Sequence, residues 1–500
     1  MEKLILLLPL LVPIIGTLCL STNKIIKDKY MKKFVGIIVF VNLGLVLNSA
    51  YNVNTTTSHL IKVNEFLDIY FKVDKLGVLF SLMASILWIL TSFYSFEYMS
   101  HESKKRMFYA FFVLTLGVTV GISFAGNLFT LYIYYEILTL STFPLVIHAG
   151  TKEALYSGKK YIIYSFSGAT LIIFGMMILY SVTGNMNFTH GGIFSNAALS
   201  DKNLILISYI SMFLGFGVKS ALVPFHSWLP AAMVAPTPVS ALLHAVAVVK
   251  SGIFSLIRIT YFVFGATVIK EIGAVKYLIP FAIITILMGS LLALHQDHLK
   301  KRLAYSTISQ LGYIILGILM LNKNGLSGAL LHLINHAFIK ITLFFIVGAI
   351  THQTGKKYIH QINGLGKNMK ITFVCFTIAS ISLIGIPPTN GFVSKWFLSM
   401  GALNNGSIFQ VIILLFSAFL TASYLLPIPV AAFFRKSEDQ LILEEHLNED
   451  FAHLELERDS KDPNKFMLVP IVILTAIIIF LGLFPNVIIS FINDILLEVF

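Results

Sequence analysis

The stretch LILISYISMFLGFGVKSAL (residues 204–222) is long and apolar enough to cross a lipid bilayer, yet it carries a lysine, Lys219. A lysine in the hydrocarbon layer costs roughly 2.5–3.5 kcal/mol on insertion scales. Gly215 and Gly217 come just before this lysine and Pro224 follows it, which predicts a helix that is interrupted beside the charge. Interrupted membrane helices with a buried charge are typical of ion pathways.

The composition of the whole chain indicates many such helices. Of its 500 residues 57% are hydrophobic and only 12% are charged, and the mean hydropathy is +0.84. We expect an all-α polytopic membrane protein with about 14 transmembrane helices of roughly 20 residues each, because backbone groups in hydrocarbon must be paired within the segment. The predicted spans are residues 4–22, 33–50, 76–98, 108–125, 127–148, 160–184, 203–222, 237–261, 277–294, 303–321, 326–350, 371–399, 407–434 and 466–492.

The net charge of +12 could suggest a nucleic-acid partner, but the distribution of the basic residues argues against one. With the N-terminus outside, the predicted cytoplasmic loops hold 23 of the 36 lysines and arginines and the outer segments hold 8. This asymmetry is the positive-inside signal of a multi-pass protein of the cell membrane, and it predicts both termini on the outer side. The first apolar run lacks a small-residue cleavage site, so we expect a retained helix.

Further ionisable residues fall inside the apolar runs. The acidic one is Glu136, and the basic ones besides Lys219 are Lys250, Arg258, Lys340 and Lys395, accompanied by His244, His332 and His336. Such residues within membrane spans mark ion or proton paths. The row therefore predicts a path for protons or cations.

Two predicted spans are interrupted and each carries a lysine. The seventh breaks before VPFHSWLP (residues 223–230), and the twelfth contains GIPPTNGFVSKWF (residues 385–397). Lys219 and Lys395 are 176 residues apart, about five spans with their loops, so we predict two inverted five-helix repeats. The predicted units are 1–107 (three helices), 108–261 (first repeat), 276–434 (second repeat), 435–465 (cytoplasmic polar linker) and 466–500 (last helix).

Two polar stretches lie outside the spans. Residues 435–465 are either a solvated helical linker or a docking surface for a partner subunit. Residues 65–75 (EFLDIYFKVDK) alternate apolar and polar side chains, which predicts a short outer strand.

The chemistry of the buried charges leaves alternatives open. Burial disfavours the protonated form of a lysine and a nearby carboxylate favours it, so Lys219 beside Glu136 could be loaded and unloaded with a proton. The other interpretation is a buried ion pair that only locks helices together. Arg258, near the outer end of its span, is expected to extend to the headgroups. His226, His295 and His298 lie near the cytoplasmic surface and are weak candidates for proton uptake.

The histidines favour a proton relay over a metal site. His332, His336 and Lys340 lie at i, i+4 and i+8, one stripe of a helix, and imidazoles exchange protons near neutral pH. A metal pair would need a third ligand, which the neighbourhood lacks, and a plain core role for either histidine stays open. His244 and Lys250 are six residues apart, so on a regular helix they face different sides.

Five motifs together resemble one family. They are LYIYYEILTLSTFPLV (131–146), GFGVKSALVPFHSWLPAAMVAPTPVSALLHAVAVVKSGIFSLIRI (215–259), DHLKKRLAYSTISQLGYI (297–314), LLHLINHAFIKITLFFIVGAI (330–350) and GIPPTNGFVSKWF (385–397). The chain resembles the antiporter-like subunits of respiratory complex I, Mrp-type Na⁺/H⁺ antiporters and membrane-bound nickel–iron hydrogenases over roughly spans three to thirteen.

The resemblance implies a proton- or Na⁺/H⁺-translocating subunit that has no redox cofactor of its own and works with other membrane subunits. It assigns Glu136, Lys219, Lys250 and Lys395 to the family's membrane glutamate and lysines. His244 matches the eighth-helix histidine of some members, and the eleventh-helix histidine–lysine group corresponds to His332, His336 and Lys340. The pairing of His244 with Lys250 is most similar to the Mrp D subunit and its hydrogenase counterpart. One complex I subunit has a glutamate at the position that corresponds to Lys395, so the chain differs from that subunit at this residue.

Other classes of protein also fit these residues. A proton-pumping subunit of complex I, an NADH:quinone oxidoreductase, is the first alternative, and a stand-alone secondary transporter is the second. An intramembrane metalloenzyme is disfavoured by its missing ligands. Whether the host assembly is an oxidoreductase is not fixed by these residues.

Overall fold

The computed structural model describes residues 2–51, 53, 57–62, 68–194, 201–436 and 461–500. Among them, eleven helices are long and apolar enough to cross a membrane. Two shorter apolar helical segments, Leu6–Ser21 and Lys370–Ile384, accompany them. The prediction of a helical polytopic membrane protein is therefore confirmed, while the count of fourteen stays a prediction. Of the linker 435–465, residues 437–460 lie outside the described residues.

The helices follow one another through short loops. The first half contains α1 (Glu2–Ser21), α2 (Asp28–Tyr51), α3 (Lys75–Tyr98), α4 (Lys105–Ser123), α5 (Leu128–Val146), α6 (Lys152–Thr183), α7 (Lys202–Lys219), α8 (Trp228–Ala231), α9 (Thr237–Ala245), α10 (Val248–Ile257) and the π-helix η3 (Arg258–Phe264). The second half contains α11 (Ala266–Glu271), α12 (Val275–His295), α13 (Leu299–Leu319), α14 (Lys323–Thr354), α15 (Lys370–Ile384), α16 (Asn390–Asn404), α17 (Ile408–Leu425), α18 (Pro427–Phe434), α20 (Lys465–Leu483) and α21 (Asn486–Val499).

A small hairpin precedes α3. Strand β1 (Thr57–Lys62) pairs antiparallel with β2 (Asp68–Lys72), with Thr57 opposite Lys72. The predicted strand is confirmed for Asp68–Lys72, and residues 65–67 of that prediction lie outside the described residues. Tyr70 anchors the hairpin, because its hydroxyl donates to the Gly126 carbonyl before α5.

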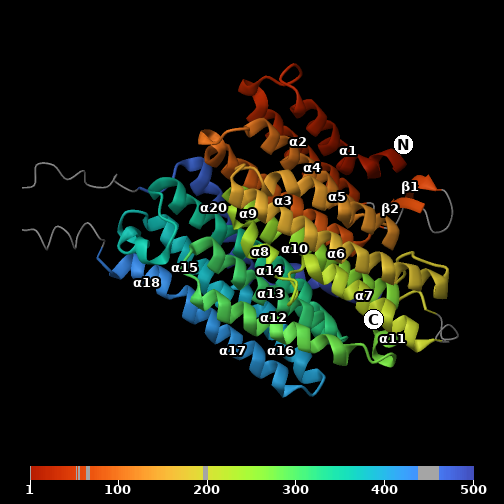
Figure 1. The fold of residues 1–500 in the computed structure, drawn as a ribbon. Coiled ribbons are helices and arrows are strands. Elements are labelled where there is room, and N and C mark those ends of the chain that lie inside the picture. Colours follow the sequence, from red (N-terminus) through yellow and green to blue (C-terminus); the bar gives the residue numbers. More distant parts are fainter. Residues whose placement is uncertain (1, 52, 54–56, 63–67, 195–200, 437–460) are drawn as a thin grey trace, which may run out of the picture.

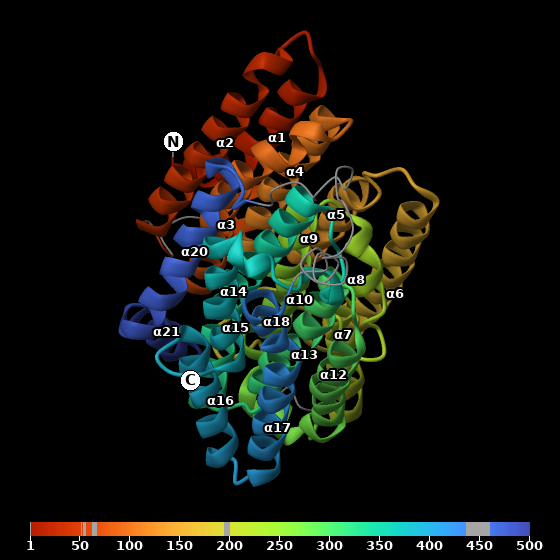
Figure 2. The same cartoon turned by 90° about the vertical axis from the view of Figure 1, so that its left-hand side faces the viewer.

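The helices run side by side along a common direction (Figure 1). Helices α1, α2 and α4 form one edge of the bundle, and α16 and α17 lie at the opposite edge (Figure 2). Two spans are wholly buried along their apolar part, the α9–α10–η3 segment (Thr237–Phe264) and α14 (Lys323–Thr354). The outer helices instead expose large apolar side chains such as Leu415 and Phe419, as expected of lipid-facing surfaces.

Both predicted interruptions are present. The seventh span stops at Lys219, and a non-helical turn leads to α8 at Trp228. The twelfth span is divided into α15 and α16, with Gly385 in the left-handed conformation (φ 93°) at the end of α15. Glycine tolerates this conformation without steric cost, so the break is placed where the sequence indicated it.

The eighth span contains a third interruption that we did not predict. Helix α9 ends at Ala245 and α10 begins at Val248, with Val246 between them at φ −138° and ψ −59°. The amides of Val246 and Ala247 both donate to the Leu242 carbonyl. The residues around the break are alanine and valine, so no glycine or proline signals it, and the expectation of one regular helix over 237–261 was wrong.

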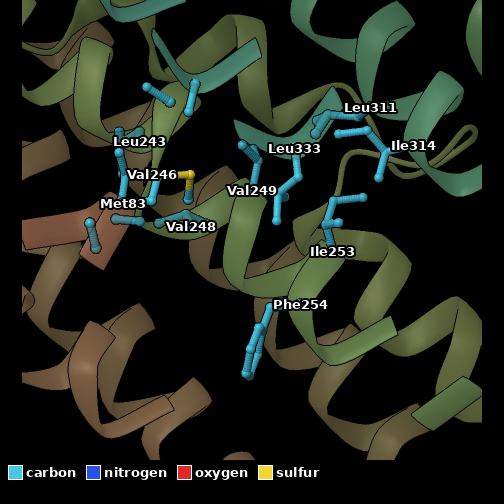
Figure 3. Close-up of a cluster of buried hydrophobic side chains, with 14 of the residues drawn as sticks. Met83, Leu243, Val246, Val248, Val249, Ile253, Phe254, Leu311, Ile314 and Leu333 are labelled. Atoms are coloured by element: carbon cyan, nitrogen blue, oxygen red, sulfur yellow. The ribbon is translucent and has the colours of Figure 1, made fainter. Parts of the chain in front are cut away.

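Apolar packing holds the interrupted eighth span in place. Leu243, Val246, Val248 and Val249 around the break pack with Met83 of α3 and with Leu311 and Leu333 of α13 and α14 (Figure 3). The Phe254 ring of α10 stacks on Phe80 of α3, with ring centroids 4.8 Å apart. The predicted last span, 466–492, also differs: α20 ends at Leu483, and Pro485 separates it from α21.

The break of the twelfth span supplies a stability prediction. A Cβ on Gly391, at the start of α16, would lie 1.8 Å from the Ser382 carbonyl oxygen of α15. Gly391→Ala should therefore separate the two half-helices and cost about 3 kcal/mol, the upper end of the usual overpacking range. Gly44→Ala is the control, because nothing lies within 4 Å of a Cβ there. Thermal unfolding of purified protein in detergent measures both, and equal midpoints would contradict this packing.

Candidate functional site

Glu136 and Lys219 meet inside the first half of the bundle. Lys219, the last residue of α7, has its Nζ 3.7 Å from Oε1 of Glu136 on α5. The ammonium also donates to the Tyr135 carbonyl oxygen and lies 3.3 Å from the centroid of the Tyr135 ring. Three groups of α5, a carboxylate, a carbonyl and an aromatic face, therefore stabilise the positive charge of Lys219.

The two members of this pair differ in access. The Lys219 side chain is 1% exposed and the Glu136 side chain is 18% exposed. Oε1 of Glu136 accepts no hydrogen bond within the described residues. The contact is thus an ion pair without a fixed hydrogen bond, a geometry that is easier to break than a bidentate salt bridge.

Lys395 of α16 has a different set of partners. Its Nζ donates to the carbonyl oxygens of Leu383 and Ile384, both at 2.8 Å. These carbonyls belong to the last turn of α15, where helix ends leave unpaired acceptors and a partial negative charge. Among the described residues no carboxylate pairs with Lys395, and the Tyr313 ring centroid lies 5.1 Å from its Nζ. The break of the twelfth span therefore holds this charge with backbone oxygens.

The broken-helix lysines share one feature and differ in another. Each lies over a tyrosine ring, Tyr135 from α5 or Tyr313 from α13. Lys219 ends the half-helix before its break, whereas Lys395 lies in the half-helix after its break.

His332 connects the Lys395 region to the centre of the molecule. Its Nδ1 is 2.9 Å from Oγ of Ser394, the neighbour of Lys395, and its Nε2 is 3.0 Å from Oε1 of Gln310. The His332 ring also stacks on Tyr313, with centroids 5.6 Å apart. On the other side, the His336 ring lies 5.9 Å away. The His332–His336 stripe predicted from the sequence is thus continuous with Lys395.

A cluster of basic groups occupies the centre. Lys340 donates to the Leu303 carbonyl oxygen at 3.1 Å and to the Ser306 hydroxyl. His336 interacts electrostatically with Lys250, Lys340 and His244. Neither ring nitrogen of His336 or His244, nor Nζ of Lys250, has a hydrogen-bond partner within the described residues. Buried cations without partners or water are too costly to persist, so these groups must be neutral or hydrated for most of the time.

The cluster and the Glu136–Lys219 pair approach each other but share no polar contact among the described residues. Ser220, next to Lys219, packs directly against Gly252, two residues after Lys250. A Cβ on Gly252 would lie 2.4 Å from the Ser220 hydroxyl oxygen. The α7 break and the part of α10 that carries Lys250 are therefore neighbours. The electrostatic interaction of Lys250 described above is with His336, in the second half of the chain.

Arg258 differs from its prediction. The side chain is 0% exposed and does not extend to the headgroups. It forms a bidentate ion pair with Asp74, the cap of α3, through Nη1 to Oδ2 and Nη2 to Oδ1 (2.7 Å). The rings of Phe188, Phe254 and Phe262 surround the guanidinium at 4.8–5.0 Å. The expected snorkelling was wrong because Asp74, counted as a residue outside the span, is buried with it.

Several polar residues of the site escaped the sequence analysis. Asn335, between the two histidines of α14, donates to the Asn390 carbonyl at 2.7 Å, and Asn390 donates back to its Oδ1. Ser382 donates to Oδ1 of Asn390. This network ties the break of the twelfth span to the histidine stripe. Asn335 lies near the histidine face of α14, and that position was the signal available in the sequence.

The surface histidines stand apart from the row. His295 is exposed, and its Nδ1 lies 2.9 Å from the Leu291 carbonyl oxygen. His226 lies in the turn after α7, where burial and the nearby Lys160 lower its pKa despite a hydrogen bond to Pro224. His298 packs edge-on against Tyr358. No group of three or more His, Cys, Asp or Glu side chains within the described residues could hold a metal ion.

These features define a polytopic membrane protein with a row of ionisable groups buried between its helices. Residues 125–421 match the profile described as NADH:quinone oxidoreductase/Mrp antiporter, transmembrane, and this match spans more than half of the chain. The chain belongs to the NADH:quinone oxidoreductase/Mrp antiporter transmembrane family.

Curated relatives come from both named branches. The chain is 35% identical over 396 residues to the NADH-quinone oxidoreductase subunit N of Desulforudis audaxviator, covering 77% of this chain and 76% of the relative. It is 31% identical over 475 residues to the Na⁺/H⁺ antiporter subunit A1 of Staphylococcus haemolyticus, covering 90% of this chain. The match spans 56% of that longer relative.

Solved structures share the fold over nearly the whole chain. A chain of an archaeal membrane-bound sulfane sulfur reductase superposes with a TM-score of 0.85 at 24% identity, covering 98% of this chain and 97% of that one. A chain of the Mrp complex of a Dietzia species gives 0.83 at 21% identity, covering 97% and 96%. A chain of respiratory complex I of Thermus thermophilus gives 0.74 at 20% identity, covering 96% and 98%.

The Asp74–Arg258 pair yields a prediction about stability. Asp74→Asn leaves the buried guanidinium without a counter-charge and should cost about 3–5 kcal/mol, whereas Asp74→Asn with Arg258→Met should recover much of this loss. Asp28→Asn, which removes the exposed partner of Arg106, is the control and should cost less than about 1 kcal/mol. Thermal unfolding in detergent provides the comparison. An Asp74→Asn variant as stable as the wild type would show that the Asp74–Arg258 pair does not hold η3 to α3.

Proposed function

We propose that this chain is a proton- or Na⁺/H⁺-translocating, antiporter-like subunit of a multisubunit membrane complex. The observation that carries the proposal is the row of buried side chains that joins Lys395 of α16 to the ionisable groups of the two wholly buried spans. It runs from Lys395 through Tyr313, His332 and His336 to the basic cluster of Lys340, Lys250 and His244. A protein that only needed packing there would gain nothing from the cost of burying these groups.

In the proposed mechanism, protons move between neutral bases. A buried lysine or imidazole without a partner is an acceptor, and protonating one member of the cluster raises the cost of protonating its neighbours. Two lysines have compensation: the Glu136 carboxylate lies beside Lys219, and carbonyl oxygens at the end of α15 accept from Lys395. Weakening the Glu136–Lys219 ion pair would favour release of the Lys219 proton, so in this proposal Lys219 carries the proton and Glu136 tunes it.

The proposed membrane topology of the chain follows from its sequence. We infer fourteen spans, two inverted five-helix repeats over 108–261 and 276–434, and both termini on the outer side of the cell membrane. The two broken spans, each with a lysine over a tyrosine ring, support the repeat. The basic loops support the orientation.

The host complex is proposed to be of Mrp type, with this chain as its D-like subunit or the hydrogenase counterpart, partnered by other membrane subunits. The A1 subunit that matches the chain is named a Na⁺/H⁺ antiporter, which supports the ion exchange. The second candidate is a proton-pumping subunit of an NADH:quinone oxidoreductase, favoured by the 35% identity to subunit N. Co-purification of the native complex distinguishes the two by its other subunits.

The Lys219 pair gives the first functional prediction. Lys219→Ala should reduce ion translocation in vesicles at least tenfold, about 1.4 kcal/mol in the barrier, while the complex still assembles. Glu136→Gln should impair transport, and Glu136→Asp should keep part of it because the charge remains. Lys202→Ala, at the exposed start of the same helix, is the control and should transport normally. Wild-type transport by Lys219→Ala would refute the assigned role.

Lys395 gives the second functional prediction. Lys395→Ala should block transport, because the row of ionisable groups loses the residue at its end. Lys395→Glu should keep some transport, because a carboxylate also exchanges protons. His336→Ala should slow transport without abolishing it, since water can fill the space of an imidazole. Proton uptake by vesicles, followed with a pH-sensitive dye, measures all three. Transport by Lys395→Ala at the wild-type rate would exclude this end of the path.

A further inference from the structure

A polar cavity of about 420 Å³ lies where the ends of several helices meet. Its walls come from the end of α3, the α5–α6 loop, the turn before α9, the start of α13 and the end of α14 with the loop after it. The charge count places all of these loops on the same, basic side of the membrane. The cavity therefore opens between the two halves of the bundle on one face.

The cavity has an exposed rim and a buried floor. Glu102, Glu153 and Lys357 on its rim are exposed, whereas Ala235 and Val347 on its floor are each 1% exposed. Charged side chains at the mouth and room for several waters make it a hydrated recess rather than an empty apolar void.

The floor has a polar connection to the α9 part of the row. Nζ of Lys300 donates to the Ala235 carbonyl oxygen at 3.2 Å, and the Ser240 hydroxyl donates to the same oxygen at 3.2 Å. Ser240 lies in α9 four residues before His244, so both side chains share one helical face. Ser240, which is hydrogen-bonded to the floor carbonyl of Ala235, is thus about one helical turn from His244 along α9.

A second connection follows α13. Lys300 lies in the first turn of this helix, and Leu303 follows it by three residues, a rise of roughly 4.5 Å. The Leu303 carbonyl oxygen accepts a hydrogen bond from Lys340 at 3.1 Å. Helix α13 therefore carries Lys300 at the cavity and the anchor of Lys340 one turn deeper.

We propose that this cavity is the water-filled inlet through which protons from the side of the basic loops reach Lys340 and His244, with Lys300 as the uptake residue at its inner end. The inference rests on the proposed function, since it supplies the row with its source of protons. A hydronium ion relayed through the cavity water gives its proton to the neutral Lys300 amine and leaves water, and the ammonium then releases the proton to the inner bases.

The electrostatics of the cavity suit this role. Burial and the neighbouring Lys357 lower the pKa of Lys300 to about 8, while Glu102 opposes the shift. The other charged or titratable groups that face the cavity are Tyr98, Glu102, Glu153, His298, Lys301, Lys357 and Tyr358. Lys300 is thus mostly protonated below about pH 8 and mostly neutral above it, so it exchanges protons close to physiological pH.

Accessibility of the floor provides the first test. In a background with Cys19→Ser and Cys375→Ala, Val347→Cys places a thiol on the cavity floor, and Ile346→Cys places an equally buried thiol next to it but outside the cavity. A cationic, membrane-impermeant methanethiosulfonate reagent is added to vesicles holding the whole complex, from the side of the basic loops. Val347→Cys should react at least tenfold faster than Ile346→Cys, and its modification should slow proton uptake.

The outcomes separate this inference from the proposed function. Equal reaction rates, or modification of Val347→Cys without any effect on transport, would overturn the inlet. In either case a transport defect of Lys219→Ala would leave the proposed function standing. Normal transport by Lys219→Ala would remove the proposed function instead. Reaction of Val347→Cys only from the opposite side would also overturn the inlet as stated.

The pH profile provides the second test and does not depend on cysteine variants. Arginine stays charged at every working pH, so Lys300→Arg should remove the limb of the transport–pH profile near pH 8. Lys301→Arg is the matched control, because the hydrogen bond from the α13 lysines to the Ala235 carbonyl comes from Lys300, and the limb should persist. A limb near pH 8 that survives Lys300→Arg would exclude Lys300 as the uptake residue.

Discussion

The cost of placing a charge among apolar helices is the constraint on which this structure depends. Each buried ionisable group must be paired, solvated by backbone oxygens or kept neutral. Arg258 is paired by Asp74 through both terminal nitrogens, and Lys219 is paired more loosely by Glu136. Lys395 is held by the free carbonyls of α15. Lys250, His244 and His336 have no such partner in the described structure, so these groups must be neutral or hydrated.

The interrupted helices are the means by which the fold meets this cost. A continuous helix uses all its inner carbonyls for its own hydrogen bonds, and only a helix end has acceptors to spare. The α15–α16 break brings such an end to Lys395, and the Asn335–Asn390–Ser382 network fixes the break against α14. The half-helices thus hold Lys395 and the proposed proton-transfer residues in fixed positions, as the proposed relay requires.

Much of this arrangement could be predicted from the sequence because its signals are local. Apolar runs predicted the helices, glycine and proline predicted two of the breaks, and lone charges in apolar runs predicted the members of the row. The spacing of His332, His336 and Lys340 by four predicted one stripe, and α14 has it. The break at Val246 could not be predicted, because it is produced by packing among α3, α13 and α14 and not by a helix-breaking residue.

The sequence by itself determined a polytopic helical membrane protein, its family and the residue types at its centre, since hydrophobicity and motif spacing are properties of short segments. Only the tertiary structure decided which charges meet. Asp74 and Arg258 are 184 residues apart in the sequence. Lys219 of α7 pairs with Glu136 of α5. The cavity beside Lys300 is formed by five separate loops and helix ends. Such contacts depend on how distant helices pack, which no single stretch of sequence encodes.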